Sequence, residues 1–173
     1  MLTDYVVIDL EMTGLNAKTD RILEAGAARV RGNVVTAAFS EIINPKRELS
    51  EKVISLTGIT NEMAVQGKEM DATLMAFLDF IGEDILVGQN VIFDYSFLKQ
   101  WAVNHKRTFE RNAVDTLKLA RKFLPQKQKK DLASLCSYFG IERVHAHRAL
   151  DDVMETQQIF EQLQKMYEAG APE

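Results

Sequence analysis

The stretch Tyr5-Val6-Val7-Ile8-Asp9-Leu10-Glu11 decides how this chain of 173 residues folds. Its apolar run predicts a short strand over residues 5–10, which leads into Glu11. Because residues two apart on a strand point to the same face, Asp9 and Glu11 project side by side. Like charges held together protonate or bind a cation, and hard oxygen ligands favour Mg²⁺ or Mn²⁺. The strand therefore predicts one part of a metal site.

Composition indicates a single globular domain. Hydrophobic residues make up 46% of the chain and charged residues 27%, so we expect one domain over residues 1–168 and a short tail at 169–173. No window approaches the roughly 18 apolar residues of a membrane-spanning helix, and we expect a cytoplasmic protein with no membrane contact. Cys136 is the only cysteine in the chain. We expect it to be a small buried apolar residue, as free cysteines usually are.

The chain is acidic as a whole but contains one local run of basic residues. The formal net charge of −4 argues against a general nucleic-acid-binding surface, which is usually basic. A local run of basic residues nevertheless contains no acid, and its members are Lys118, Arg121, Lys122, Lys127, Lys129 and Lys130. Two interpretations remain open: a solvated helix end and loop, or a surface that holds a phosphate backbone outside the active site.

The order of the expected elements indicates a mixed sheet covered by helices. Two β-rich segments, 21–31 and 33–43, meet at Gly32-Asn33, which is typical of a tight hairpin. Further short strands are expected at residues 85–87 and 113–114. Caps, apolar spacing and terminating residues predict helices over residues 53–56, 71–81, 93–104, 117–123, 132–139 and 147–167. Hairpins followed by alternating strands and helices predict an α/β fold.

Three further polar residues lie where such a fold gathers its ligand sites. Asp94 comes at the start of a helix after a strand, and His147 and Asp152 come at the start of the last helix. Ligand sites in α/β sheets form at strand ends and adjacent helix starts, so these residues converge with Asp9 and Glu11. Aspartate there can hold metal, whereas an imidazole suits a general base. The set predicts metal-dependent hydrolysis of phosphodiesters, with two ions clamping the phosphate.

Each residue taken alone also has an ordinary structural interpretation. Asp9 and Glu11 are compatible with a solvated strand edge. Asp94 is compatible with a helix cap that faces water. Asp152 is favoured in the first turn of a helix by the helix dipole, without any metal. Only the joint order of these residues along the chain distinguishes a site from four unrelated acids.

The three segments that carry these residues are the most specific feature of the chain. They are Ile8-Asp9-Leu10-Glu11-Met12-Thr13-Gly14, Gly88-Gln89-Asn90-Val91-Ile92-Phe93-Asp94 and His147-Arg148-Ala149-Leu150-Asp151-Asp152. Together they resemble the motifs of the DEDD superfamily of 3′-to-5′ exonucleases, in the histidine-containing branch typified by the proofreading epsilon subunit of bacterial DNA polymerase III. The resemblance implies an RNase H-like, mixed five-stranded sheet. It also implies two Mg²⁺ or Mn²⁺ ions, with the metal ligands Asp9, Glu11, Asp94 and Asp152 and the general base His147.

The same resemblance implies contacts to the substrate. The segment Ile54-Ser55-Leu56-Thr57-Gly58-Ile59-Thr60 is similar to one that approaches the terminal nucleotide in this family. The implied substrate-binding residues are Leu15, Ile59 and Phe93, as apolar contacts to the last bases, together with Met12, Thr13 and Asn90. Many epsilon-like members have histidine in place of Thr57 and Gln89, and threonine in place of Met12. The sequence from Asp9 to Leu15 also resembles the corresponding segment of oligoribonucleases.

These features predict an enzyme that releases nucleoside 5′-monophosphates from the 3′ end of single-stranded DNA or RNA. Its expected partner is a nucleic acid with a free 3′ end. Two alternatives are a proofreading or accessory module that works with a DNA polymerase, and an oligoribonuclease-like enzyme that acts on RNA. A nucleic-acid binder without activity is a third alternative. The presence of all four acids and the histidine argues against it.

Overall fold

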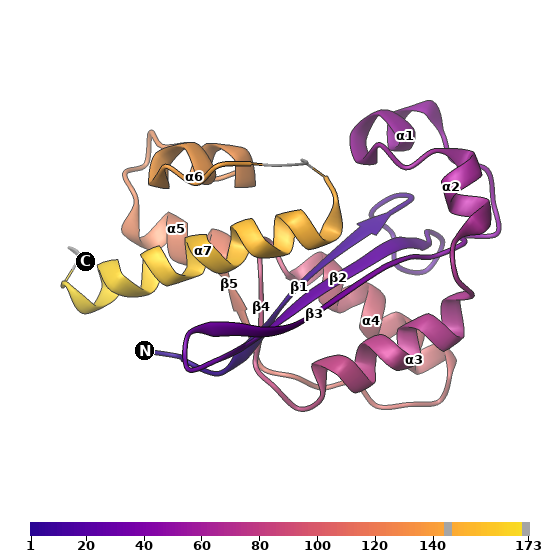
Figure 1. Ribbon diagram of the computed structural model, residues 1–173, viewed down its shortest axis with the longest axis horizontal. Coiled ribbons are helices and arrows are strands. Elements are labelled where there is room, and N and C mark those ends of the chain that lie inside the picture. Colours follow the sequence, from indigo (N-terminus) through magenta and orange to yellow (C-terminus); the bar gives the residue numbers. More distant parts are fainter. Residues whose placement is uncertain (144–146, 171–173) are drawn as a thin grey trace.

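The computed structural model describes residues 1–143 and 147–170, which form one mixed sheet covered by helices (Figure 1). The strands are β1 (Tyr5–Met12), β2 (Ile22–Arg31), β3 (Val34–Ile42), β4 (Leu86–Gly88) and β5 (Ala113–Asp115). The helices are α1 (Glu51–Thr57), α2 (Asn61–Gln66), α3 (Met70–Ile81), α4 (Ile92–Asn104), α5 (Thr116–Phe123), α6 (Leu132–Phe139) and α7 (Ala149–Glu168). Of the expected tail at 169–173, residues 171–173 lie outside the described part of the chain.

The sheet has the strand order β3-β2-β1-β4-β5, which confirms the expected mixed sheet of five strands. β1, β2 and β3 are antiparallel, whereas β4 pairs in parallel with both β1 and β5. The β2–β3 hairpin turns at Gly32 and Asn33, whose φ angles are 56° and 65°. Positive φ at both central residues is what a two-residue turn of the I′ type requires, and glycine and asparagine meet that requirement at little cost. The expected hairpin is therefore confirmed.

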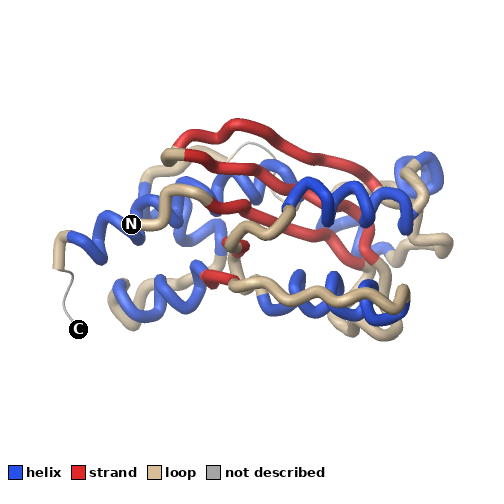
Figure 2. Tube along the Cα trace, turned by 90° about the horizontal axis from the view of Figure 1, so that it is seen from below, coloured by secondary structure: helices blue, strands red, loops and turns tan. Residues whose placement is uncertain are grey.

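The two faces of β1 are buried by different helices. Val6 and Ile8 pack in a core with α3 and α4, whereas Tyr5 and Val7 pack with α7 on the other face. Figure 2 shows the strands side by side across the molecule with helices beside them. Strand alternation continues the second face to the acids at positions 9 and 11. The acidic end of β1 therefore lies under α7.

The first turn of α7 lies directly against β2 at Gly26. A Cβ atom on Gly26 would lie 2.6 Å from the carbonyl carbon of Ala149, so a larger residue would displace the helix. Two residues earlier on β2, the buried carboxylate of Glu24 accepts the backbone N–H of Ala149 at 3.0 Å and an N–H of Arg148 at 2.8 Å. The side chain of Arg148 provides no cap for α7, so a carboxylate of the sheet caps the helix instead.

Three local features differ from the expectations. β1 continues beyond residue 10 to Met12, and α7 begins at Ala149 rather than at His147, which has a φ of 60°. Helix α2 was not expected, because six residues are too few to show an apolar period. Its one local signal is Thr60, whose hydroxyl accepts the N–H of Met63 at 3.3 Å. Short elements are therefore recognised by their caps.

In the part of the chain that the structure describes, no helix is long and apolar enough to cross a lipid bilayer. Cys136 is buried in the small core between α5, α6 and α7, as expected for a cysteine that fills space. Burial raises the pKa of its thiol to about 12. The thiol is therefore uncharged at neutral pH.

Replacing Gly26 with alanine should destabilise the fold by about 1–3 kcal/mol, the usual cost of forcing an extra methyl group into a packed core. The methyl group has no room beside Ala149 unless α7 moves away from β2. Urea unfolding at fixed pH measures the loss, and Ala38→Val on the exposed side of β3 is a control that adds carbon without a clash. A Gly26→Ala protein as stable as the wild type would show that α7 is not held this close.

Candidate active site

Asp9 and Glu11 lie at the end of β1 and face α7. Asp9 is opposite Gly26 on β2, and Glu11 is opposite Glu24. The register shifts between Glu11 and Met12, which is a bulge of the kind often found beside active sites because it re-aims side chains. The two carboxylates expected from the first motif therefore share one face of the sheet with the carboxylate that caps α7.

Asp94 reaches the same place from the first turn of α4. β4 pairs with β1 only at Val6 and Val7, so β1 has no ladder partner from β4 beyond them. The N–H of Leu10 donates instead to Oδ1 of Asp94 at 2.8 Å. Asp94 is buried, unlike a helix cap that faces water, and its charge acts on Asp9.

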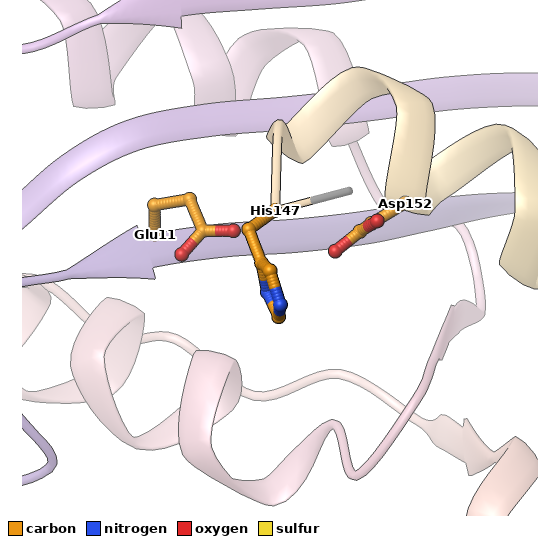
Figure 3. A group of neighbouring side chains, drawn as sticks. All are labelled: Glu11, His147 and Asp152. Carbon is orange, nitrogen blue, oxygen red and sulfur yellow. The ribbon is translucent and has the colours of Figure 1, made fainter. Parts of the chain in front are cut away.

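The start of α7 brings His147 and Asp152 close to Glu11 of β1 (Figure 3). Ligand atoms of Glu11, His147 and Asp152 all lie within 4.8 Å of one another. Asp152 is buried in the first turn of the helix, whereas His147 is exposed just before it. The structure therefore brings the four expected acids and the histidine together at one end of the sheet.

Burial favours the protonated forms of these acids, and for Asp9 and Glu11 repulsion from the other acids adds to the effect. Burial, followed by the charges of Asp94 and Glu11, raises the pKa of Asp9 well above its usual range. Burial first, and then the charges of Asp152 and Glu24, raises the pKa of Glu11 to about 8. Burial also raises the pKa of Asp94 to about 7 and raises the pKa of Asp152. A divalent cation would relieve this repulsion, so the donor set fits a hard metal ion.

Two arginines form three ion pairs beside the site that the sequence reasoning missed. Arg148 pairs with Glu24, and Arg143 bridges Asp152 at 3.0 Å and Glu155 at 2.8 Å. These arginines partly offset the negative charge beside the expected metal ligands and hold the chain on both sides of His147. Two signals could have indicated them: Glu24 is an acid within an apolar strand, and Glu155 follows Asp152 by three residues, on the same helix face.

The loop after β1 presents Leu15 to solvent. Asp20 accepts the N–H of Asn16 at 2.9 Å, and the hydroxyl of Thr13 accepts the N–H of Arg21 at 3.0 Å. These bonds close the loop and leave Leu15 69% exposed. Thr13 therefore shapes the loop, and Leu15 is available to a ligand.

The other expected substrate contacts are not equally accessible. Met12, Asn90 and Phe93 are partly exposed. Ile59, by contrast, is fully buried in a small core beneath α1 and α2. In this structure Ile59 supports the turn between the two helices, because apolar packing encloses it, and the expected contact of its side chain with the last bases stays a prediction.

Two positions that depart from epsilon-like members are bonded within the protein. The hydroxyl of Thr57 donates to the carbonyl of Val53 at 2.9 Å and is buried at the end of α1. The amide of Gln89 donates to the carbonyl of Lys130 at 2.7 Å and accepts the hydroxyl of Thr116. Both side chains therefore hold local structure together.

The chain matches the model of the RNase T family, described as exonuclease, over residues 6–160. It belongs to this exonuclease family. The exonuclease is 37% identical over 157 residues to the epsilon subunit of DNA polymerase III from Aquifex aeolicus, covering 90% of this chain and 78% of that protein. It is 38% identical over 157 residues to the PolC-type DNA polymerase III of Bacillus subtilis, covering 88% of this chain but 11% of that protein. The chain is thus a hydrolase of the DEDD group of 3′-to-5′ exonucleases, which are typically metal-dependent.

Solved structures share its fold. Zinc-bound Escherichia coli exonuclease I in complex with single-stranded DNA superposes with a TM-score of 0.82 at 20% identity, covering 98% of this chain and 42% of that one. Exonuclease X in complex with 5′-overhanging duplex DNA superposes with a TM-score of 0.74 at 22% identity, covering 96% of this chain and 93% of that one. These matches confirm the RNase H-like fold.

Without metal, the exonuclease should lose stability as the pH rises from about 5 to about 8. The folded state keeps protons on Glu11 and Asp94 up to pKa values of about 8 and 7, whereas the unfolded chain releases them near 4.5 and 3.8. The folded state binds more protons in this range, so the free energy of unfolding falls by up to about 1.4 kcal/mol per pH unit for each proton retained.

Urea unfolding in the presence of a chelator at pH 6, 7 and 8 measures this slope. Glu11→Gln should flatten it, and Glu48→Gln, at an exposed position, should leave it unchanged. A chelated wild type whose stability rises with pH over this range would contradict the raised pKa values.

Proposed function

We propose that the exonuclease hydrolyses single-stranded DNA, and RNA as an alternative substrate, from the 3′ end and releases nucleoside 5′-monophosphates. The observation that carries the proposal is the convergence of Asp9, Glu11, Asp94 and Asp152 with His147. Escherichia coli exonuclease I, which shares the fold, was crystallised with single-stranded DNA, and this supports a single-stranded substrate.

The four acids would hold two Mg²⁺ or Mn²⁺ ions. When bound, such ions neutralise phosphate charge, activate water and stabilise the leaving 3′ oxygen. The carboxylate oxygens suit hard divalent ions better than soft ones. The charges of Asp94, Glu11 and Asp152 all act on Asp9, so Asp9 lies among the acids that would hold the ions.

His147 would accept the proton of the attacking water. Its imidazole is exposed beside Glu11 and Asp152, so it is open to solvent at the edge of the carboxylate cluster. The next residue, Arg148, is held by the buried carboxylate of Glu24, which anchors the backbone that carries the imidazole. An imidazole exchanges protons near neutral pH, as a general base must.

The side chains around the acids would bind the last nucleotides without reading their sequence. Leu15 and Phe93 offer apolar surface, and every base has a flat apolar face that such residues can contact. Met12, Thr13 and Asn90 would complete these contacts. We therefore expect degradation with little base preference.

The metal assignment is tested by comparing wild-type, Asp9→Asn and Asp79→Asn proteins. We expect Asp9→Asn to lose Mn²⁺ binding by calorimetry and more than about 10³-fold of its turnover, because Asp9 lies at the centre of the acids. Asp79 is an exposed acid of α3 and is the matched control. Turnover is read as shortening of single-stranded DNA or RNA labelled at the 5′ end, with Mg²⁺, Mn²⁺ or chelator. Full activity in Asp9→Asn would exclude the site.

In the same assay, His147→Gln separates a base from a ligand. A general base contributes about 10²–10⁴-fold, so turnover should fall by this amount while Mn²⁺ binding stays near the wild-type value. Loss of Mn²⁺ binding would instead reassign His147 as a metal ligand.

A second candidate function is proofreading in partnership with a DNA polymerase. The observation that favours it is the match to a DNA polymerase III epsilon subunit over 78% of that subunit's length, together with the match to a segment of PolC-type polymerases. The chain spans only 11% of the Bacillus subtilis PolC-type protein, so the polymerase activity of that protein lies largely outside the shared region.

Affinity purification of the full chain from native extract tests this second function. Proofreading predicts a co-purifying polymerase whose misincorporation rises when Asp9→Asn replaces the wild type. Recovery of the active exonuclease without any polymerase, at salt concentrations that preserve protein complexes, would favour a free-standing enzyme.

A further inference from the structure

A hollow of about 800 Å³ opens beside Asn90, two residues before the start of α4, the helix that carries Asp94. Its polar lining residues are Gln89, Asn90, Arg121, Gln126, Gln128, Lys130 and Asp131, and the apolar side chains of Leu117 and Leu132 complete the lining. The hollow therefore combines cationic groups with amide donors and acceptors. Nothing in the catalytic chemistry of the acids and His147 requires these residues.

The wall of this hollow is the loop of residues 124–131 between α5 and α6, which internal hydrogen bonds hold in place. The ammonium of Lys130 donates to the carbonyls of Pro125 at 2.8 Å and Gln128 at 2.6 Å. The amide of Gln89 donates to the carbonyl of Lys130 at 2.7 Å. Because Gln89 adjoins Asn90, whose N–H donates to the carboxylate of Asp115 at 2.9 Å, the loop is tied to the backbone that leads to the active site.

The loop concentrates positive charge on an acidic protein. Arg121, Lys127 and Lys129 are exposed, and no salt bridge joins them to an acid within the described ranges. The adjacent Asp131 caps α6, where it accepts the N–H of Ser134 at 2.9 Å and its hydroxyl at 2.7 Å. The cations therefore remain available to an anionic ligand.

A second hollow, of about 470 Å³, lies beside the same loop. Lys127 and Lys129 line it together with Ser134, Ser137 and Tyr138. Tyr138 is 45% exposed, so its ring is available for stacking. We call the two hollows and the loop between them the α5–α6 groove.

We propose that the α5–α6 groove binds the substrate strand on the 5′ side of the bond that is cleaved, several nucleotides away from the acids. This inference rests on the proposed function. The cations would contact backbone phosphates, the amides would bond to base edges, and Tyr138 would stack on a base. A duplex offers the groove only its backbone, whereas an unpaired strand also offers base faces and edges. The chemistry of the lining therefore favours the unpaired continuation of the same strand.

The test compares a dinucleotide, which is too short to extend from the active site to the groove, with a single-stranded 12-mer. The groove variant is Arg121→Gln/Lys127→Gln/Lys129→Gln. The control variant is Lys106→Gln/Arg107→Gln/Lys165→Gln, which removes the same number of charges at exposed positions on α7 and after α4. Wild type and both variants are assayed for kcat/KM on each substrate at several salt concentrations.

We expect the groove variant to lower the ratio of kcat/KM for the 12-mer to that for the dinucleotide by about 10-fold or more. The salt dependence of KM for the 12-mer should weaken by about 2 in the log–log slope, since each phosphate contact to a single strand contributes about 0.7. Tyr138→Leu should raise KM for the 12-mer by about 5-fold without changing that slope. The control variant should keep the wild-type ratio.

An unchanged ratio in a groove variant that still cleaves both substrates would overturn the inference and leave the proposed function intact. A duplex with a short 3′ overhang is assayed as a third substrate, and a defect seen only with this duplex, and not with the 12-mer, would also overturn the inference and assign the groove to the complementary strand. Failure of the wild type to cleave either substrate would instead refute the proposed function.

Discussion

The close contact between the first turn of α7 and strand β2 is the constraint on which the site depends. Gly26 lets the backbone of Ala149 approach the sheet, and Glu24 caps the helix by accepting the N–H of Ala149. This contact sets the height and direction of α7 over β1, and so brings Asp152 and His147 to the acids of β1. A site assembled from both ends of the chain thus relies on one glycine and one buried carboxylate.

The second constraint is electrostatic. Burial raises the pKa values of Asp9, Glu11, Asp94 and Asp152, and repulsion from neighbouring acids raises those of Asp9, Glu11 and Asp94 further, so ionising the cluster without a cation destabilises the fold. The pair of Arg148 with Glu24 and the bridge from Arg143 to Asp152 offset only part of this charge. The site is therefore poised for divalent metal, and its stability and its function favour opposite protonation states.

Charge is also divided in space. The metal-binding end of the sheet gathers acids, whereas the loop between α5 and α6 exposes cations on a chain with a net charge of −4. A polyanion would be repelled by the bare acids and attracted by the loop, so the α5–α6 groove would supply affinity that the catalytic centre lacks. Gln89 connects the two regions through its bond to Lys130.

The sequence alone determined most of the elements and the identity of the clustered residues, because these depend on local signals. Gly32-Asn33 specified the hairpin, the apolar run before Asp9 specified the central strand, and the resemblance to the third motif of the exonuclease family singled out Asp152 and His147. Only the tertiary structure decided that Ile59 is enclosed and that Glu24 caps a helix 125 residues away, since both outcomes depend on long-range packing. The same holds for the α5–α6 groove: the basic run is visible in the sequence, but its place beside Asn90 follows from how the loop packs.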